Sequence, residues 1–294
     1  MGRRTFTLAM EGVTRRELRA LVELLRDDDP AVRTQVTGHL LRLGDAALTV
    51  LDCAAATADL GHRARLSAVR DEVRRARTLD RLEAFAAMRG TARVEDGAAL
   101  VAQLFHPGLD LARVRGKLDE LARTFPEAAQ AADPYASLDA VRRRLHIELG
   151  FRGNRADYYD PENSLIHRVL ARRTGIPIAL SVIYLALGRR LGQSVAGIGL
   201  PGHFIVRWGD AEPPLYADAF DGGAPLTELD CARLAQRHGP PLKAEHLLPV
   251  DAQEIAARIV RNLAGVWRQL GEGGLAALAR AAHTRLRPEI TLPE

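Results

Sequence analysis

Apolar residues in the first part of the chain recur with the 3.6-residue period of amphipathic helices. One apolar stripe of this kind comprises Leu18, Leu21, Val22, Leu24 and Leu25. Asp29 and Pro30 suit the N-cap and first turn of a following helix, and Gly44 suits its end. The same periodicity predicts further helices over residues 46–58 and 66–87.

Helical periodicity continues as far as residue 150. Residues 96–105 and 111–125 are amphipathic. Another helix is predicted over residues 138–149, with Ser137 as its N-cap. The first half of the chain is therefore expected to be helical.

The pattern changes at Phe151 into a polar, turn-forming stretch. Asn163 or Ser164 is expected to cap the short helix that follows. Gly175-Ile176-Pro177 then leads into a second helix over residues 178–191, and apolar residues surround this helix almost completely. A helix of this kind is predicted to be buried.

Beyond this helix the apolar runs become short and β-like. Residues 195–200, 203–208 and 215–220 are three strand candidates separated by Pro and Gly. The tail returns to helix, most clearly over residues 252–270. Together the patterns predict an α+β fold, with a helical N-terminal region, a buried helix packed on antiparallel strands, and a helical C-terminal tail.

The charge pattern argues against a nucleic-acid surface. The chain of 294 residues has a net charge of +4, and its Lys residues are confined to positions 117 and 243. The Arg residues are interleaved with acids, as in residues 71–75, whereas a phosphate-binding face needs clustered positive charge. We therefore expect no nucleic-acid partner.

Several other classes of protein also lack support. No apolar run approaches the ~20 residues that span a bilayer, and Met1–Met10 lacks the apolar core of a signal peptide. The two cysteines, Cys53 and Cys231, form no CxxC, and the His residues form neither HxxxH nor HExxH. We expect a cytoplasmic protein of bacterial type without metal, cofactor or membrane segment.

A buried helix followed by antiparallel strands is typical of papain-like and transglutaminase-like enzymes. Their chemistry needs a Cys at the helix N-terminus, a His on the next strand as base, and an Asp or Asn to orient the His. Here His203 begins one strand candidate and Asp218 lies near the end of the next, within reach of a hydrogen bond. The helix begins at Pro177, with no thiol.

Four segments carry a family resemblance: Asn163-Ser164, residues 172–178, residues 199–204 and residues 218–223. They resemble the SirB-type branch of the transglutaminase-like superfamily, also called the second transglutaminase-like core family. The similarity extends upstream to residues 149–154 and Tyr158-Tyr159, and downstream to residues 261–263. It covers roughly residues 95–285.

The resemblance implies a shared fold, but the usual thiol mechanism is not expected, because the matched position holds no thiol. The family pattern Gly-x-Cys, laid on Gly175-Ile176-Pro177, places Pro177 where the nucleophile would stand. His203 matches the catalytic His and Asp218 the catalytic Asp. Proline has neither a nucleophilic side-chain atom nor an N–H. In addition, Ala219 stands where family members often have Pro. Many members continue into a tetratricopeptide-like tail, whereas this sequence predicts one helical pair in its C-terminal part.

The N-terminal helices suggest a second resemblance. Residues 24–33, followed by residues 40–44, resemble a single HEAT repeat. A stable solenoid usually needs about three repeats, so the alternative is a helical region that packs on the rest. We predict a helical, HEAT-like segment at 1–90, a SirB-type domain at 91–285 with its core at 151–227, and a tail at 286–294.

Ligand-binding candidates are Asn154, Tyr158, Tyr159, Asn163 and Ser164. Tyr offers a flat apolar face and a polar tip for a ligand, although it could equally anchor the loop to the core. Ser164 has the simpler alternative role of a helix cap.

Three functions are open at this stage. We expect a non-thiol transglutaminase-like protein, a pseudo-enzyme that binds a peptide, a small ligand or a protein partner. The alternative is a hydrolase or acyltransferase in which the pair of His203 and Asp218 works with Ser164, Ser181 or an activated water. The third is a scaffold, which the HEAT-like segment favours.

Overall fold

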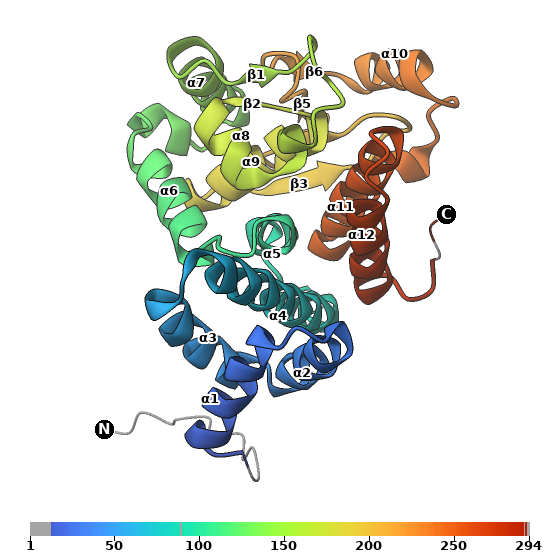
Figure 1. Ribbon diagram of the computed structural model, residues 1–294. Coiled ribbons are helices and arrows are strands. Elements are labelled where there is room, and N and C mark those ends of the chain that lie inside the picture. The colour runs from blue at the N-terminus through green and yellow to red at the C-terminus, as the bar shows by residue number, and fades with distance from the viewer. Residues whose placement is uncertain (1–12, 89, 291, 293–294) are drawn as a thin grey trace. The chain divides into compact units, whose positions relative to one another are not determined.

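The computed structural model describes residues 13–88, 90–290 and 292 (Figure 1). The expectation that Met1–Met10 lacks a signal peptide falls outside these residues. The chain forms two compact units, one up to Thr78 and one from Leu79 onward. Helix α4, Leu60–Ala87, contains the boundary between them.

The first unit is helical. It contains α1 (Arg15–Glu23), α2 (Pro30–Leu43) and α3 (Asp45–Thr57), and the first part of α4. The predicted N-cap of α2 is confirmed, because Asp29 accepts the backbone N–H of Ala31. The unit has its own apolar core, which consists of residues from all these helices, among them Leu18, Val36, Leu40, Leu51, Leu66 and Val73.

The second unit opens with three helices. These are α5 (Val94–Phe105), α6 (Leu111–Arg123) and α7 (Pro134–Arg142). The prediction of Ser137 as an N-cap was wrong, since Asp133 caps α7 and accepts the N–H groups of its first turn. Ser137 lies inside α7 and donates to the carbonyl of Ala129 at 2.7 Å. A π-helical turn, η3 (Arg143–Glu148), continues from α7.

Helix α9 (Pro177–Arg190) is the centre of the second unit. Every residue from Pro177 to Gly188 is buried, which confirms the predicted burial of this helix. It follows the short helix α8 (Ile166–Arg172) and packs against α5, α6 and the sheet. The predicted cap of α8 was wrong, because Leu165 occupies the N-cap position and makes no side-chain cap.

The sheet is antiparallel with strand order β6-β5-β4-β3-β7. Its strands are β3 (Val195–Ile198), β4 (Ile205–Trp208), β5 (Tyr216–Ala217), β6 (Pro225–Leu226) and β7 (Pro249–Val250). Strands β3, β4 and β5 confirm the three predicted strands. They are shorter than predicted, because turns begin at Leu200 and at Asp218. A separate parallel pair joins β1 (Arg152–Gly153) to β2 (Thr174–Gly175).

Three helices complete the second unit. Helix α10 (Glu228–His238) follows β6, and the 3-10 turn η5 (Ala244–Leu247) leads to β7. Helices α11 (Ala252–Gln269) and α12 (Gly273–Leu286) then pack side by side (Figure 1). Helix α11 also packs on α5. Within the described part of the chain, no helix has the length and apolar character needed to cross a bilayer.

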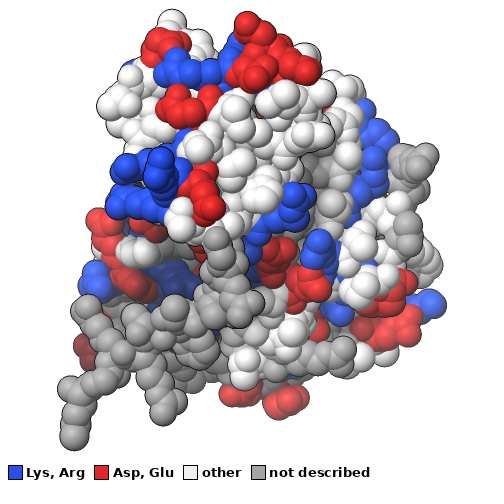
Figure 2. Space-filling view, turned by 60° about the horizontal axis from the view of Figure 1, so that its bottom comes forward, with Lys and Arg blue, Asp and Glu red and all other residues white. Residues whose placement is uncertain are grey.

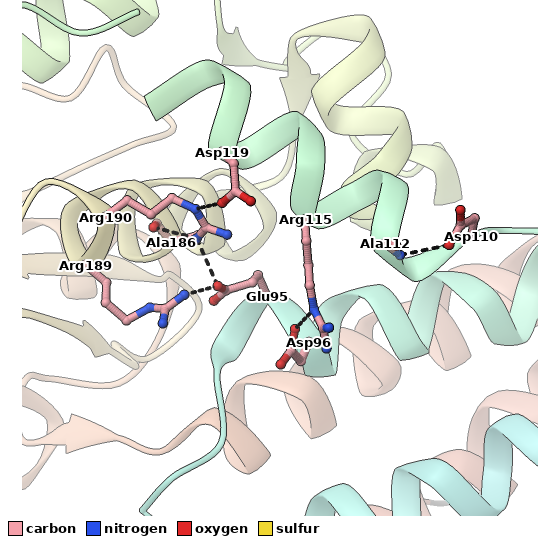
Figure 3. A network of polar contacts seen from close by, with 9 residues as sticks. All are labelled: Glu95, Asp96, Asp110, Ala112, Arg115, Asp119, Ala186, Arg189 and Arg190. Atoms are coloured by element: carbon pink, nitrogen blue, oxygen red, sulfur yellow. Dashed lines mark hydrogen bonds and ion pairs between the residues drawn. The ribbon is translucent and has the colours of Figure 1, made fainter. Parts of the chain in front are cut away.

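A buried carboxylate joins three helices of this unit (Figure 3). Glu95 of α5 is 1% exposed and accepts hydrogen bonds from Arg189 and Arg190, both on α9. Arg190 also donates to Asp119 of α6 at 2.7 Å. A charge inside a protein is tolerated only when it is paired and hydrogen-bonded. This network therefore ties α9 to the two helices that cover it.

Surface charges are interleaved, as the sequence indicates. On the face drawn in Figure 2, Lys and Arg side chains lie among Asp and Glu side chains. Among the described residues, ion pairs at the surface join side chains a few positions apart in the chain, such as Arg144 with Glu148 and Arg142 with Asp139. Exposed pairs of this kind contribute little stability.

His167 on α8 is predicted to make the second unit sensitive to acid. Its Nδ1 is buried and has no hydrogen-bond partner among the described residues. Burial lowers the pKa of His167 to about 4, and the neighbouring His106 and Arg168 add to this effect. The unfolded pKa is ~6.5, so the stability associated with neutral His167 is complete above pH ~6.5 and is lost as pH falls towards 4.

Because His167 is only partly buried, solvent screening reduces the effect to about 1–2 kcal/mol. The test is urea unfolding of the wild type and of His167→Phe at pH 7.5 and 4.5. The wild type should lose more free energy of unfolding than the variant over this interval. Equal losses would contradict the prediction.

Candidate functional site

His203 and Asp218 lie next to each other at one end of two paired strands. His203 comes shortly before β4 and Asp218 directly after β5, and these strands pair antiparallel. The Nε2 of His203 lies 3.0 Å from Oδ2 of Asp218, which confirms the predicted hydrogen bond. Since an ionised carboxylate only accepts, the bonding proton belongs to Nε2. The two residues are 6% and 5% exposed.

The turn after β5 holds the Asp218 carboxylate in place. Its Oδ1 accepts the backbone N–H of Phe220 at 2.9 Å, while Oδ2 receives His203. The Asp218 carbonyl accepts the backbone N–H of Gly223 at 2.8 Å and closes the turn. A carboxylate with both oxygens engaged is oriented before any ligand arrives.

Pro177 occupies the first position of α9, with Ile176 as N-cap. Both residues are buried. Ser181, one turn further along α9, is completely buried, and its Oγ has no hydrogen-bond partner among the described residues. The start of α9 therefore presents no thiol, and the Ser181 hydroxyl one turn along it is enclosed in the core.

Asn154 and Asn163 hold the segment before α9 together. Asn154 donates through Nδ2 to Oδ1 of Asn163 at 3.0 Å, and its backbone N–H donates to the carbonyl of Gly175. Asn163 is fully buried; its side chain donates to the carbonyl of Asp157 and its carbonyl accepts the N–H of Ile176. These contacts fix the loop on the entry to α9. Ser164 is also buried in this region.

Aromatic side chains form a stack that leads from the surface to His203. Tyr159 is 60% exposed and meets Tyr158 edge to face, and Tyr158 meets Phe220 in the same way. The Phe220 ring in turn packs edge to face against His203, with 6.2 Å between ring centroids. The guanidinium carbon Cζ of Arg155 lies over the Phe220 ring, 5.1 Å from the ring centroid. The structure thus brings Tyr158 and Tyr159 to the same site as the pair of His203 and Asp218.

A second His near the site, the partly buried His146, was not predicted from the sequence. The Nδ1 of His146 donates to the carbonyl of Phe151, so its Nε2 is the acceptor for the hydroxyl of Tyr184 at 2.7 Å. Burial lowers the pKa of His146 and raises that of Tyr184. Gly223, in the turn that holds Asp218, lies against both side chains. His146 lies in the π-helical turn η3, and no periodicity in the sequence marks such a turn.

The two cysteines are expected to differ in reactivity. Cys231 is fully buried, and burial raises the pKa of its thiol to about 12, whereas Cys53 is exposed on α3. Only the thiolate reacts readily. An Ellman titration of the native protein should therefore modify one thiol per chain, and the second only after unfolding. Rapid modification of both thiols, or of Cys231 in a Cys53→Ser variant, would contradict this expectation.

The described residues offer no group of three or more His, Cys, Asp or Glu side chains placed to hold a metal ion.

Known proteins are similar to the part of the chain that contains these residues. The profile of the transglutaminase-like superfamily matches residues 112–261, which include Pro177, His203 and Asp218. A UPF0162 protein of Xylella fastidiosa is 36% identical over 184 residues, which are 58% of this chain and 63% of that protein. A UPF0162 protein of Pseudomonas aeruginosa is 32% identical over 193 residues, which are 63% of this chain and 68% of that protein.

A mammalian protein shows the same kind of likeness over a shorter stretch. F-box only protein 21 of Mus musculus is 37% identical over 142 residues, which are 46% of this chain and 22% of the mouse protein. The aligned part of this chain therefore spans less than two thirds of the length of the Xylella protein and about a fifth of the length of the mouse protein. No solved structure matches the chain.

Proposed function

The chain belongs to the transglutaminase-like superfamily and to the UPF0162 proteins, and from this premise we propose that it is a non-thiol, SirB-type pseudo-enzyme that works by binding. The site of His203 and Asp218 takes a peptide, a small ligand or a segment of a protein partner. We assign this binding domain to residues 91–285, with its core at residues 151–227. The helical N-terminal segment, HEAT-like in sequence, offers a surface for a protein partner.

One observation carries this proposal. Pro177 is buried at the first position of α9, where the family pattern requires the nucleophile, while His203 and Asp218 still form a hydrogen-bonded pair. A proline has no atom that attacks a carbonyl. The retained pair can still donate, accept and orient, which suits recognition of a polar group.

The surroundings of the pair support binding. Tyr158, Tyr159 and Phe220 supply aromatic surface above His203, and aromatic side chains contribute much of the energy of recognition. Asn154 remains partly exposed in the same loop. A ligand that contacts the tyrosines would approach the pair through Phe220. We place the protein in the cytoplasm and expect its partner to be a protein or a peptide.

The alternative, a hydrolase or acyltransferase, needs a nucleophile near the pair. Ser181 is completely enclosed, and Ser164 is 4% exposed. A ligand could reach the Ser181 hydroxyl only after the core opened. The alternative therefore has to use Ser164 or an activated water as its nucleophile, while the binding function is supported by the buried Pro177 at the nucleophile position.

The proposal is tested by capture of partners from a native extract on immobilised protein, followed by binding measurements with each purified partner. Wild type, His203→Ala and Tyr158→Ala are compared with a matched control, Tyr135→Ala, which changes an exposed tyrosine of α7. A partner of the site should bind wild type and the control equally and both site variants at least about tenfold more weakly. Equal binding to all four proteins would contradict a role of this site.

The same samples are tested for turnover. Purified wild type should show no iodoacetamide-sensitive transamidation or peptidase activity, since Pro177 replaces the thiol. Thiol-dependent turnover that disappears in Cys231→Ser would overturn the pseudo-enzyme interpretation.

A further inference from the structure

Arg258 on α11 contacts the turn that presents His203. Its Nη2 donates to the carbonyl of Leu200 at 2.8 Å and to the carbonyl of His203 at 2.7 Å. The Leu200 carbonyl also accepts the backbone N–H of His203. One guanidinium nitrogen therefore bridges the two ends of the four-residue turn.

The sequence of the turn suits this geometry. Pro201 and Gly202 occupy its central positions, and Gly202 has a positive φ of 67°, as a Pro-Gly turn of type II requires. Gly199, just before the turn, leaves room for the guanidinium: a Cβ at this position would lie 2.8 Å from Nη1 of Arg258. The residues that the family pattern groups around His203 thus meet a side chain from a distant helix.

The environment of Arg258 differs from that of an ordinary surface arginine. Its guanidinium lies 5.5 Å from the ring centroid of buried Phe204, directly after His203 in the chain. Burial lowers the pKa of Arg258, and the nearby Arg261 acts in the same direction. Within the described part of the chain, no carboxylate lies within 4.0 Å of it to form an ion pair. Backbone carbonyls, rather than a carboxylate, hold this cation.

We infer that Arg258 is the positioning residue of His203: it holds the turn from Leu200 to His203 and so sets the imidazole against Asp218. Helix α11 thereby becomes part of the site, although it contributes no group to the pair itself. The inference rests on the proposed function for its biological meaning, but the contact that it describes can be tested without a ligand.

The experiment is NMR spectroscopy of the full chain, with two readouts. The first is hydrogen exchange of the His203 amide relative to the Val206 amide in β4. The second is the Nε2–H proton signal of the His203 ring, which the bond to Asp218 protects from solvent. Arg258→Met removes the guanidinium donors and keeps an unbranched apolar side chain, and Arg258→Lys retains a charge and donors. Arg261→Met is the matched control, since Arg261 lies one turn further along α11 and pairs with Glu254.

In Arg258→Met the exchange of the His203 amide, normalised to Val206, should accelerate at least about tenfold, and the ring N–H signal should broaden or vanish. Arg258→Lys should recover part of both signals, and Arg261→Met should change neither by more than about twofold. Gly199→Ala, which displaces Nη1 and leaves the charge intact, should reproduce the Met variant and serves if that variant does not fold.

A uniform acceleration of His203 and Val206 in both Arg258→Met and Gly199→Ala would show a general loss of stability and overturn the inference. An unchanged ring signal in both variants would overturn it as well. Failure of the proposed function would appear differently: partners would bind His203→Ala as well as wild type, while the NMR signals would still depend on Arg258.

Discussion

Replacing Glu95 by Ala is expected to lower the free energy of unfolding by about 3 kcal/mol. The substitution leaves Arg189 and Arg190 without the carboxylate that they share in Figure 3. Arg190 is mostly buried and cannot regain full hydration, although it keeps Asp119. The loss arises mainly from the cation that remains, because removing one partner of a buried pair leaves an uncompensated charge.

Urea unfolding of the wild type and Glu95→Ala measures this effect. The matched control is Glu148→Ala, which breaks the exposed pair with Arg144 and should cost less than ~1 kcal/mol. A double-mutant cycle of Glu95→Ala with Arg190→Met should give a coupling energy of about 1–3 kcal/mol. Equal costs for Glu95 and Glu148, or additive effects in the cycle, would show that the network does not hold α9 in place.

Replacing Gly223 by Ala is expected to destabilise the second unit by about 2–4 kcal/mol. Gly223 has φ of 69°, and a Cβ there would lie 2.0 Å from the Tyr184 hydroxyl and 3.0 Å from Nε2 of His146. The left-handed backbone costs an alanine about 1 kcal/mol, and the overlap with the hydrogen-bonded side chains of Tyr184 and His146 adds the rest. The turn that orients Asp218 should therefore shift away from its place.

The neighbouring Gly222 supplies a matched control. Its φ is 75°, but a Cβ would meet nothing within 4 Å, so Gly222→Ala should cost only about 1–2 kcal/mol. Tyr184→Phe, which removes the hydroxyl, should recover part of the loss in the double variant with Gly223→Ala. Thermal or urea unfolding of the wild type, the three single variants and the double variant tests this explanation. Similar costs for the two glycines, or no recovery by Tyr184→Phe, would contradict the steric explanation.

Prediction from the sequence worked best where a single periodic signal dominates. The burial of α9 followed from apolar residues on all its faces, and the three strands followed from short apolar runs bounded by Pro and Gly. Prediction failed at the ends of elements. Asp133 rather than Ser137 caps α7, because either side chain can accept the N–H groups of a first turn, and in the fold Ser137 instead donates to the carbonyl of Ala129.

By itself, the sequence determined the α+β order of elements, the proline at the start of α9 and the spacing that lets His203 meet Asp218 across two antiparallel strands. These features depend on neighbouring residues and on strand pairing, which local pattern and turn chemistry specify. Only the tertiary structure decided what surrounds the pair: Arg258 from α11, Phe220 and Tyr158 above the imidazole, and His146 with Tyr184 behind Gly223. These side chains come from segments far apart in the chain. Their meeting depends on how helices and sheet pack together, and no periodicity within one segment records that packing.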